Sequence, residues 1–185
     1  ELLAAAGMQE TISYSLTSYD TLSRTAAFQE EAPPLEVVNP MTPEHQYLRT
    51  SLQGNILNTL AANQRHSETG LRIFEVGRIY VPQSQELPQQ REMAVGVSWG
   101  AAAPLSWSTD ERQADFFDAK GIVEAVMEGL GSKGEFQPTL TPILHPGRTA
   151  EVLVGGQHVG VVGEVNQEVL DQFDISGGAV AMFEL

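Results

Sequence analysis

Cysteine is absent from the 185 residues. Its absence excludes disulfide bonds, thiolate nucleophiles and cysteine-containing metal sites. A protein without cysteine fits a reducing compartment. Long hydrophobic runs are absent as well: no stretch of about 18 apolar residues occurs, so a membrane-spanning segment is not expected. Because no basic segment precedes an apolar one, no signal peptide is expected within these residues.

Positive charge is also scarce. Lysine and arginine together number 10, against 24 aspartates and glutamates, and the formal net charge is −14. Phosphate backbones are bound chiefly by lysine and arginine, so a direct nucleic-acid-binding surface is disfavoured. We interpret the acidity of the whole chain as a contribution to solubility rather than as the sign of a basic partner.

The length and the hydrophobic content of 42% suit one domain with a sizeable core. No internal repeat, low-complexity tract or dividing linker is present. The chain opens with Glu1 rather than methionine and ends with Leu185 inside an expected strand. We therefore expect residues 1–185 to form a single domain that is a fragment of a longer, multidomain protein.

The segment 40–81 carries the clearest structural pattern. Apolar residues recur there every four positions and form one stripe of an amphipathic helix, namely Leu48, Leu52, Ile56 and Leu60. Thr50 and Ser51 at the entry of this helix can accept hydrogen bonds from its first free N–H groups. After a polar run, residues 71–81 are rich in β-branched and aromatic side chains and predict a strand.

Shorter patterns predict the remaining elements. Helices are expected at 1–6, 116–130 and 166–173, with Asn166 as the N-cap of the last. Strands are expected at 10–17, 35–39, 91–100, 135–139, 149–154, 158–164 and 179–185. The first strand is expected to be half-buried through Ile12, Tyr14 and Leu16. Hairpins between strands, with helices interspersed and no regular βαβ units, predict an α+β fold on a mostly antiparallel sheet.

Two of these elements have faces of distinct character. In strand 91–100, one face is large and suited to a core, formed by Met93, Val95, Val97 and Trp99. The other face is small enough for another group to approach closely, and consists of Ala94, Gly96, Ser98 and Gly100. The buried side of helix 116–130 is expected to contain Phe117, Ile122, Val123, Val126, Met127 and Leu130.

A serine-hydrolase motif occurs within strand 91–100. Residues 96–100 read GVSWG and match the nucleophile-elbow pattern, in which the serine stands on a sharp turn before a helix. Pro104 leaves no room for such a helix, although His145 and His158 could supply a base. We therefore interpret Ser98 as a residue on the small face of a strand.

No other catalytic or ligand-binding pattern is present. The histidines lack metal-ligand spacing and no phosphate-binding loop occurs. Asp115, Asp118 and Lys120 stand at the start of a helix, where the helix dipole favours acids, so a structural role is the better interpretation. We therefore predict no catalytic, cofactor-binding or metal-binding residue in this chain.

Several segments, taken in order, resemble one known family. They read GMQETISYSLTS, NPMTPEHQYLRTSL, IFEVGRIY, DFFDAKG, HPGRTAEV, VGVVGEVNQEVLDQFDI and VAMFEL. This succession resembles the synthetase-like core module of the phenylalanyl-tRNA synthetase beta subunit. One departure is Asn166-Gln167, where His-Pro is commoner in the family. The resemblance implies the fold of a class II aminoacyl-tRNA synthetase, with an antiparallel sheet flanked by helices.

The resemblance also implies that the module lacks synthetase chemistry. The active alpha subunit continues a strand like IFEVGRIY with an arginine that binds ATP, whereas Tyr80 here is followed by Val81 and Pro82. Glu184 stands where the alpha subunit has a glycine that allows close approach, and its carboxylate is expected to repel a triphosphate. ATP and magnesium would then be used by the parent phenylalanine–tRNA ligase complex and not by this module.

The implied partner is the alpha subunit, in a cytoplasmic heterotetramer that contacts tRNA only as a whole complex. The class II dimer interface corresponds here to residues 35–65, and its candidate contacts are Leu48, Leu52, Ile56 and Leu60. The alternative is that this stripe packs on the module's own sheet. A second functional interpretation is a free-standing synthetase paralogue that binds ATP and an amino acid.

Overall fold

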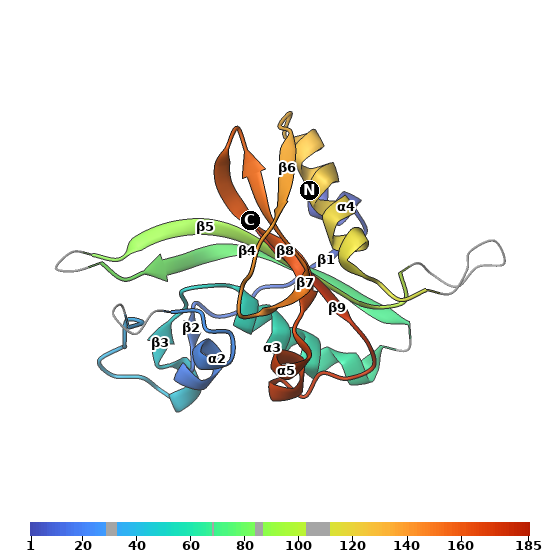
Figure 1. Ribbon diagram of the computed structural model, residues 1–185. Helices are drawn as coiled ribbons and strands as arrows, with labels where there is room; N and C mark the ends of the chain where they lie inside the picture. Colours follow the sequence, from blue (N-terminus) through green and yellow to red (C-terminus); the bar gives the residue numbers. More distant parts are fainter. Residues whose placement is uncertain (29–32, 68, 84–86, 103–111) are drawn as a thin grey trace.

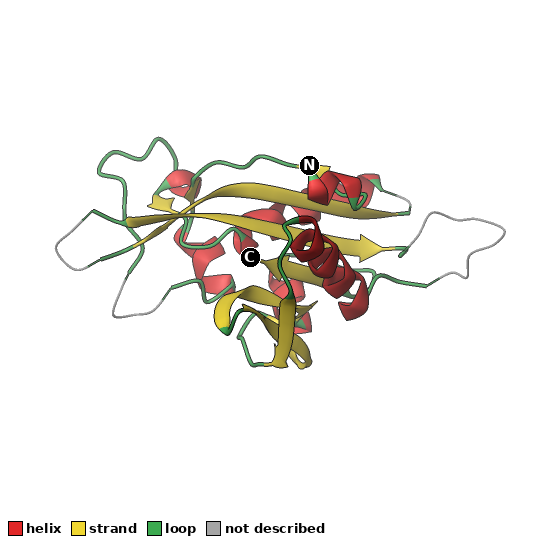
Figure 2. Cartoon of the chain, turned by 90° about the horizontal axis from the view of Figure 1, so that it is seen from above, coloured by secondary structure: helices red, strands yellow, loops and turns green. Residues whose placement is uncertain are grey.

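A computed structural model describes residues 1–28, 33–67, 69–83, 87–102 and 112–185. Its central feature is a twisted seven-stranded sheet with helices on both faces (Figure 1). Figure 2 shows the same layers from above. The prediction of an α+β fold with a mostly antiparallel sheet flanked by helices is confirmed. In the described part of the chain, no helix combines the length and apolarity needed to cross a membrane.

The strand order of the sheet is β1-β4-β5-β9-β8-β7-β6. Only β1 and β4 pair in parallel; the other neighbours are antiparallel. The strands are β1 (Gln9–Glu10), β4 (Gly70–Val81), β5 (Gln89–Gly100), β6 (Gly134–Pro138), β7 (Leu144–Val154), β8 (Gln157–Val165) and β9 (Val180–Glu184). A separate antiparallel pair consists of β2 (Leu16–Thr17) and β3 (Tyr47–Leu48).

Helices cover both faces of the sheet. One face carries α3 and α5, and the other carries α1 and α4, as Figure 1 shows. The helices are α1 (Leu2–Ala5), α2 (Tyr19–Arg24), α3 (Gln53–Asn63), α4 (Phe116–Gly129) and α5 (Gln167–Gln172), with short 3-10 turns η1 (Pro43–His45) and η2 (Gln64–His66).

Each face of the sheet has its own hydrophobic core, and strand alternation decides which residues enter which core. Val95 and Val97 of β5 point toward α3 together with Met182 of β9. Ala181 and Phe183 of β9 point toward α4. The predicted two-faced character of β5 is confirmed, because its large residues contact the α3 core and Ala94 packs against the α4 core.

Two predicted strands are wrong in extent. The chain pairs with β4 only at Gln9–Glu10 and then leaves the sheet, so the segment 10–17 forms no continuous strand. As a result Ile12 is 91% exposed and Tyr14 is 74% exposed, instead of half-buried. The expected strand 35–39 is reduced to one bridge between Glu36 and Tyr47.

The buried side of helix α4 is also narrower than expected. Ile122, Val123 and Met127 are buried as predicted, but Phe117 is 73% exposed and Leu130 is 66% exposed. Phe117 lies outside the stripe that faces the sheet, because that stripe passes through Ala119 at the helix start. Leu130 follows the last helical residue, as the C-cap.

Candidate functional site

A buried arginine joins the entry of α3 to the sheet. Arg49 Nη1 lies 2.6 Å from Glu75 Oε1 of β4, and these side chains are only 4% and 2% exposed. Arg49 Nε donates to the carbonyl oxygen of Arg78 at 2.8 Å, and Tyr80 N–H donates to the carbonyl oxygen of Arg49 at 2.9 Å. The chain before α3 is thus fixed to the part of β4 that β1 does not cover.

Ser13 and Asn55 complete this network. The Ser13 hydroxyl donates to Glu75 Oε2 at 2.7 Å and accepts from Arg49 Nη1 and Asn55 Nδ2, each at 3.0 Å. Asn55 Nδ2 also donates to the carbonyl oxygen of Tyr14 at 3.0 Å. A buried ion pair is tolerated when such hydrogen bonds satisfy its remaining polar atoms. The network therefore connects α3, β4 and the segment after β1.

Sequence reasoning missed this network, although β4 contains a signal for it. Alternation places Glu75 and Gly77 on the same face as Ile73 and Ile79, which enter the α3 core. A glutamate on a core-facing row needs a buried partner. Gly77 leaves the space that the partner occupies, since a Cβ there would overlap Arg49 Nη2.

The N-terminus of α3 is capped from strand β9. Glu184 Oε1 accepts hydrogen bonds from Leu52 N–H at 2.8 Å and from the Ser51 hydroxyl at 3.0 Å. Ser51 Oγ in turn accepts from Gln53 N–H at 3.0 Å, which confirms the predicted capping role of Ser51. A carboxylate at this position satisfies free N–H groups and complements the helix dipole.

This geometry corrects the expectation that Glu184 repels a triphosphate. Its carboxylate is buried and is directed at the first turn of α3. Phe183, the preceding residue, points to the opposite face of the sheet and enters the α4 core. The Glu184 carboxylate thus faces α3 and serves as a cap for the N-terminus of that helix.

Burial raises the pKa of Glu184 above its ordinary value, and the hydrogen bonds from Leu52 and Ser51 oppose that rise only in part. The folded chain therefore binds a proton more tightly than the unfolded chain, whose glutamates titrate near pH 4.3. The resulting stabilisation is complete below the unfolded-state pKa and is lost as the pH rises through the folded-state pKa.

Glu184→Gln is expected to remove this pH dependence. Glutamine keeps an acceptor oxygen for Leu52 and Ser51 but cannot titrate. The free energy of unfolding of the variant minus that of wild type, measured by urea unfolding, should therefore be larger at pH 8 than at pH 5. A stability difference between the two proteins that is the same at both pH values would contradict the raised pKa. Other titrating groups are common to both proteins and cancel.

The small face of β5 is filled by the module itself. A Cβ at Gly96 would lie 2.5 Å from Phe183 Cε1 and 2.8 Å from Met8 Cε. Phe183 is 1% exposed and packs among α4 residues such as Val123. The group expected to approach this face closely is therefore the Phe183 ring.

Helix α4 covers this face and is anchored at its N-terminus. Asp115 caps the helix and forms a capping box with Asp118. Arg112 binds Asp118 in a bidentate pair at 2.6 and 2.7 Å, and this contact, together with the backbone N–H of Asp115, holds the pKa of Asp118 below its ordinary value against the opposing effect of burial. Glu164 of β8 accepts from Phe116 N–H at 3.3 Å and pairs with Arg148 at 3.1 Å. Asp115 and Asp118 have the structural roles that the sequence predicted.

The predicted interface stripe lies inside the module. Leu52, Ile56 and Leu60 have no exposed surface and belong to the core between α3 and the sheet. Leu48 is half-buried and pairs with Leu16 across the β2–β3 pair. The alternative that the stripe packs on the module's own sheet describes Leu52, Ile56 and Leu60, whereas Leu48 lies outside that core.

The nucleophile-elbow interpretation of Ser98 is excluded by its setting. Ser98 lies within β5, is 1% exposed, and is paired between Arg72 and Ala181 rather than standing on a turn. Pro104 lies outside the described residues. His145 and His158 lie in strands β7 and β8. Among the residues described, no group of three or more histidine, aspartate or glutamate side chains is placed to hold a metal ion.

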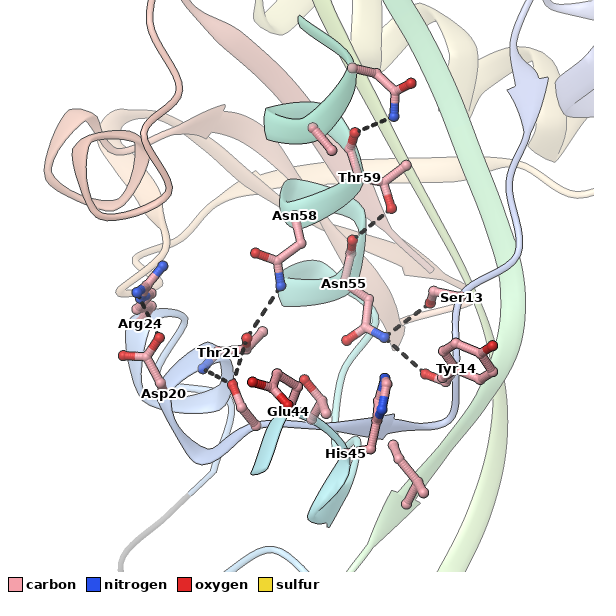
Figure 3. Close-up of a pocket in the computed structure, with 15 residues that line it drawn as sticks. Ser13, Tyr14, Asp20, Thr21, Arg24, Glu44, His45, Asn55, Asn58 and Thr59 are labelled. Carbon is pink, nitrogen blue, oxygen red and sulfur yellow. Dashed lines mark hydrogen bonds and ion pairs between the residues drawn. The ribbon is translucent and has the colours of Figure 1, made fainter. Parts of the chain in front are cut away.

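A polar pocket of about 540 Å³ opens between α2, α3 and η1 (Figure 3). It adjoins the Arg49 network, because Ser13, Tyr14 and Asn55 contribute to both. Asn58 and Thr59 of α3 form one wall. The polar face of α3, opposite the buried apolar stripe, therefore lines this pocket. Sequence reasoning did not consider that face.

Comparison with known proteins gives one consistent family. The model of the phenylalanyl tRNA synthetase beta chain CLM domain matches residues 1–185. Over its whole length, the chain is 40% identical to the phenylalanine–tRNA ligase beta subunit of Dehalococcoides mccartyi, and the match covers 23% of that subunit. Over 95% of its length, the chain is 37% identical to the corresponding beta subunit of Symbiobacterium thermophilum, and this match covers 20% of that subunit. The chain thus spans less than a quarter of these relatives.

The fold extends to a more distant synthetase. A pyrrolysyl tRNA synthetase of Desulfitobacterium hafniense superposes with a TM-score of 0.70 at 14% identity, covering all of this chain and 61% of that structure. The class II synthetase-like fold expected from the resemblance is confirmed. The match over the whole length, supported by these relatives, means that the chain belongs to the phenylalanyl tRNA synthetase beta chain CLM domain family.

Proposed function

We propose that this chain is a non-catalytic core module of a longer phenylalanyl-tRNA synthetase beta subunit. It packs against the catalytic alpha subunit and so supports the attachment of phenylalanine to its tRNA. ATP and magnesium are used by the parent complex, and tRNA is contacted only by the complex as a whole. The location that goes with this role is the cytoplasm.

One observation carries the non-catalytic part of the proposal. The small face of the central sheet is occupied by Phe183 and Met8, beneath helix α4. A nucleotide on that face would have to displace a buried phenylalanine and part of the core, at a cost of several kcal/mol. Catalysis of acyl transfer also requires positioned positive charge, whereas Phe183 belongs to a hydrophobic core with residues such as Val123 and Val162.

Exposed apolar side chains support the proposed packing against the alpha subunit. Five of the eleven large apolar side chains that are exposed among the described residues lie between positions 12 and 41, namely Ile12, Tyr14, Tyr19, Val38 and Met41. Their segments surround β2, β3 and the entry of α3, on one side of the module (Figure 1). Such residues commonly anchor protein interfaces. Val38 and Met41 lie within the expected interface 35–65.

The test uses the full-length beta chain that carries this module, mixed with the alpha subunit of the same organism. Ile12→Gln should weaken association roughly tenfold to a hundredfold, because an isoleucine that becomes buried contributes about 1.5–3 kcal/mol. Leu130→Gln is the matched control, since Leu130 is also exposed but follows α4 on the opposite face. Sedimentation velocity at graded concentrations measures the affinity.

Two results would count against this function. Wild-type chains that fail to associate at tens of micromolar would refute the packing. Binding of ATP to the chain, measured by calorimetry, would favour a free-standing synthetase paralogue instead.

A further inference from the structure

The pocket between α2, α3 and η1 presents acceptors rather than donors at its centre. Asn55 is only 9% exposed, and its amide nitrogen is fully committed to the Ser13 hydroxyl and the Tyr14 carbonyl. A carbonyl accepts only, and the Ser13 hydroxyl already donates to Glu75. The amide of Asn55 therefore cannot be reversed, and its Oδ1 is the atom left for the pocket.

No described residue donates a hydrogen bond to that oxygen. In Figure 3 the amide oxygen of Asn55 points away from Ser13 and Tyr14, toward the side on which Glu44 and His45 lie. Asn58 also lines the pocket, where its amide nitrogen donates to Thr21 Oγ1 at 3.2 Å, and in this orientation its amide oxygen accepts from no described residue. An acceptor that faces the pocket without a protein donor, on a residue that is otherwise largely buried, is a group that a ligand can satisfy in place of water.

Glu44 adds a negative charge to this pocket wall. Its own backbone N–H, and then the Thr42 hydroxyl, hold the pKa of the Glu44 carboxyl below its ordinary value. Tyr14 adds an aromatic ring that is 74% exposed and is fixed by an edge contact with His45, at 4.9 Å between ring centroids. Carboxylate, amide oxygens and an aromatic face together suit a guanidinium or ammonium group.

The other charges lining the pocket balance each other. Arg24 pairs with Asp20 at 2.6 Å and lies over the ring of Phe173 at 5.4 Å. Its charge is therefore engaged away from Asn55. Glu44 forms no ion pair within the described part of the chain, so the pocket retains a net negative charge that an incoming cation would neutralise.

We propose that this pocket receives an arginine or lysine side chain of the alpha subunit, held by Asn55, Asn58, Glu44 and the ring of Tyr14. The inference rests on the proposed function, because it takes the alpha subunit as the partner. It adds a polar, charge-selective contact beside the exposed apolar residues Ile12 and Tyr14. The cation satisfies the amide oxygen of Asn55, and the apolar residues supply the contact area around it.

The experiment measures affinity between the full-length beta chain and the alpha subunit at several salt concentrations. Glu44→Gln should weaken binding roughly tenfold and reduce its salt dependence, since a charge-assisted hydrogen bond is lost. Glu44→Lys should weaken binding roughly a hundredfold through like-charge repulsion. Asn58→Leu keeps the charge but removes an acceptor, and should also weaken binding. Glu128→Gln, an exposed acid of α4 on the opposite face, is the matched control and should change nothing.

The outcomes separate the two proposals. If the wild-type chain binds but Glu44→Lys binds equally well, no cation occupies the pocket and this inference is overturned, while the proposed function stands. If the wild-type chain does not bind, both are overturned. Because Glu44 is exposed, circular dichroism of the variants should show an unchanged fold, so a loss of binding reports on the contact itself.

Discussion

Replacing Arg49 by methionine is expected to lower the free energy of unfolding by about 3–5 kcal/mol, because it leaves the buried Glu75 carboxylate without its cation. Glu75 is 2% exposed and would keep only the Ser13 hydroxyl among its present partners. The loss is a large share of the roughly 5–15 kcal/mol that stabilises a typical domain. Urea unfolding followed by circular dichroism measures it.

The control is Arg78→Met, which replaces an arginine of β4, the strand that carries Glu75. Arg78 is 60% exposed and lies 3.7 Å from Glu92, so its removal should cost no more than about 1 kcal/mol. If Arg49→Met does not fold, Arg49→Lys remains informative. Lysine keeps the charge but lacks the guanidinium fork that reaches Glu75, Ser13 and the Arg78 carbonyl together, so an intermediate loss is expected. Equal stability of Arg49→Met and Arg78→Met would contradict the buried ion pair.

Local patterns predicted the elements that local chemistry determines. Gly155 and Gly156, between the predicted strands 149–154 and 158–164, both have positive φ, as a tight hairpin turn requires. Asn166 caps α5 by accepting from Glu168 N–H, even though the family prefers His-Pro there. The alternation of β5 correctly divided its residues between two cores. The first two depend on interactions within a few residues of the pattern, and the third on the regular alternation of side chains along a strand.

The candidate site could not be found in the same way, because its contacts are distant in sequence. Arg49 and Glu75 are 26 residues apart, and Leu52 and Glu184 are 132 apart. The stripe through Leu52 was identified correctly, but a stripe does not say whether it faces a sheet or a partner. Ile12 alternates like a strand residue, yet the chain leaves β4 at Glu10, before Ile12 can pair.

Replacing Phe183 by alanine is expected to cost about 3–5 kcal/mol, the usual result of emptying a buried aromatic site. The ring lies between β9, Gly96 of β5 and helix α4, and is 1% exposed. The adjacent strand can collapse little, because β9 is hydrogen-bonded on both sides, to β5 and to β8. Urea unfolding again gives the free energy.

A double-mutant cycle tests whether the Phe183 ring is what excludes a side chain at position 96. Gly96→Ala alone should destabilise the chain by roughly 1–3 kcal/mol, since its Cβ would overlap the ring. In the Phe183→Ala background the added methyl group has room and partly fills the cavity, so the double variant should lose less than the sum of the single losses. Coupling between contacting residues is typically about 0.5–3 kcal/mol. Additive losses would mean that another contact, such as that with Met8, keeps this face small, and the ring would no longer account for it.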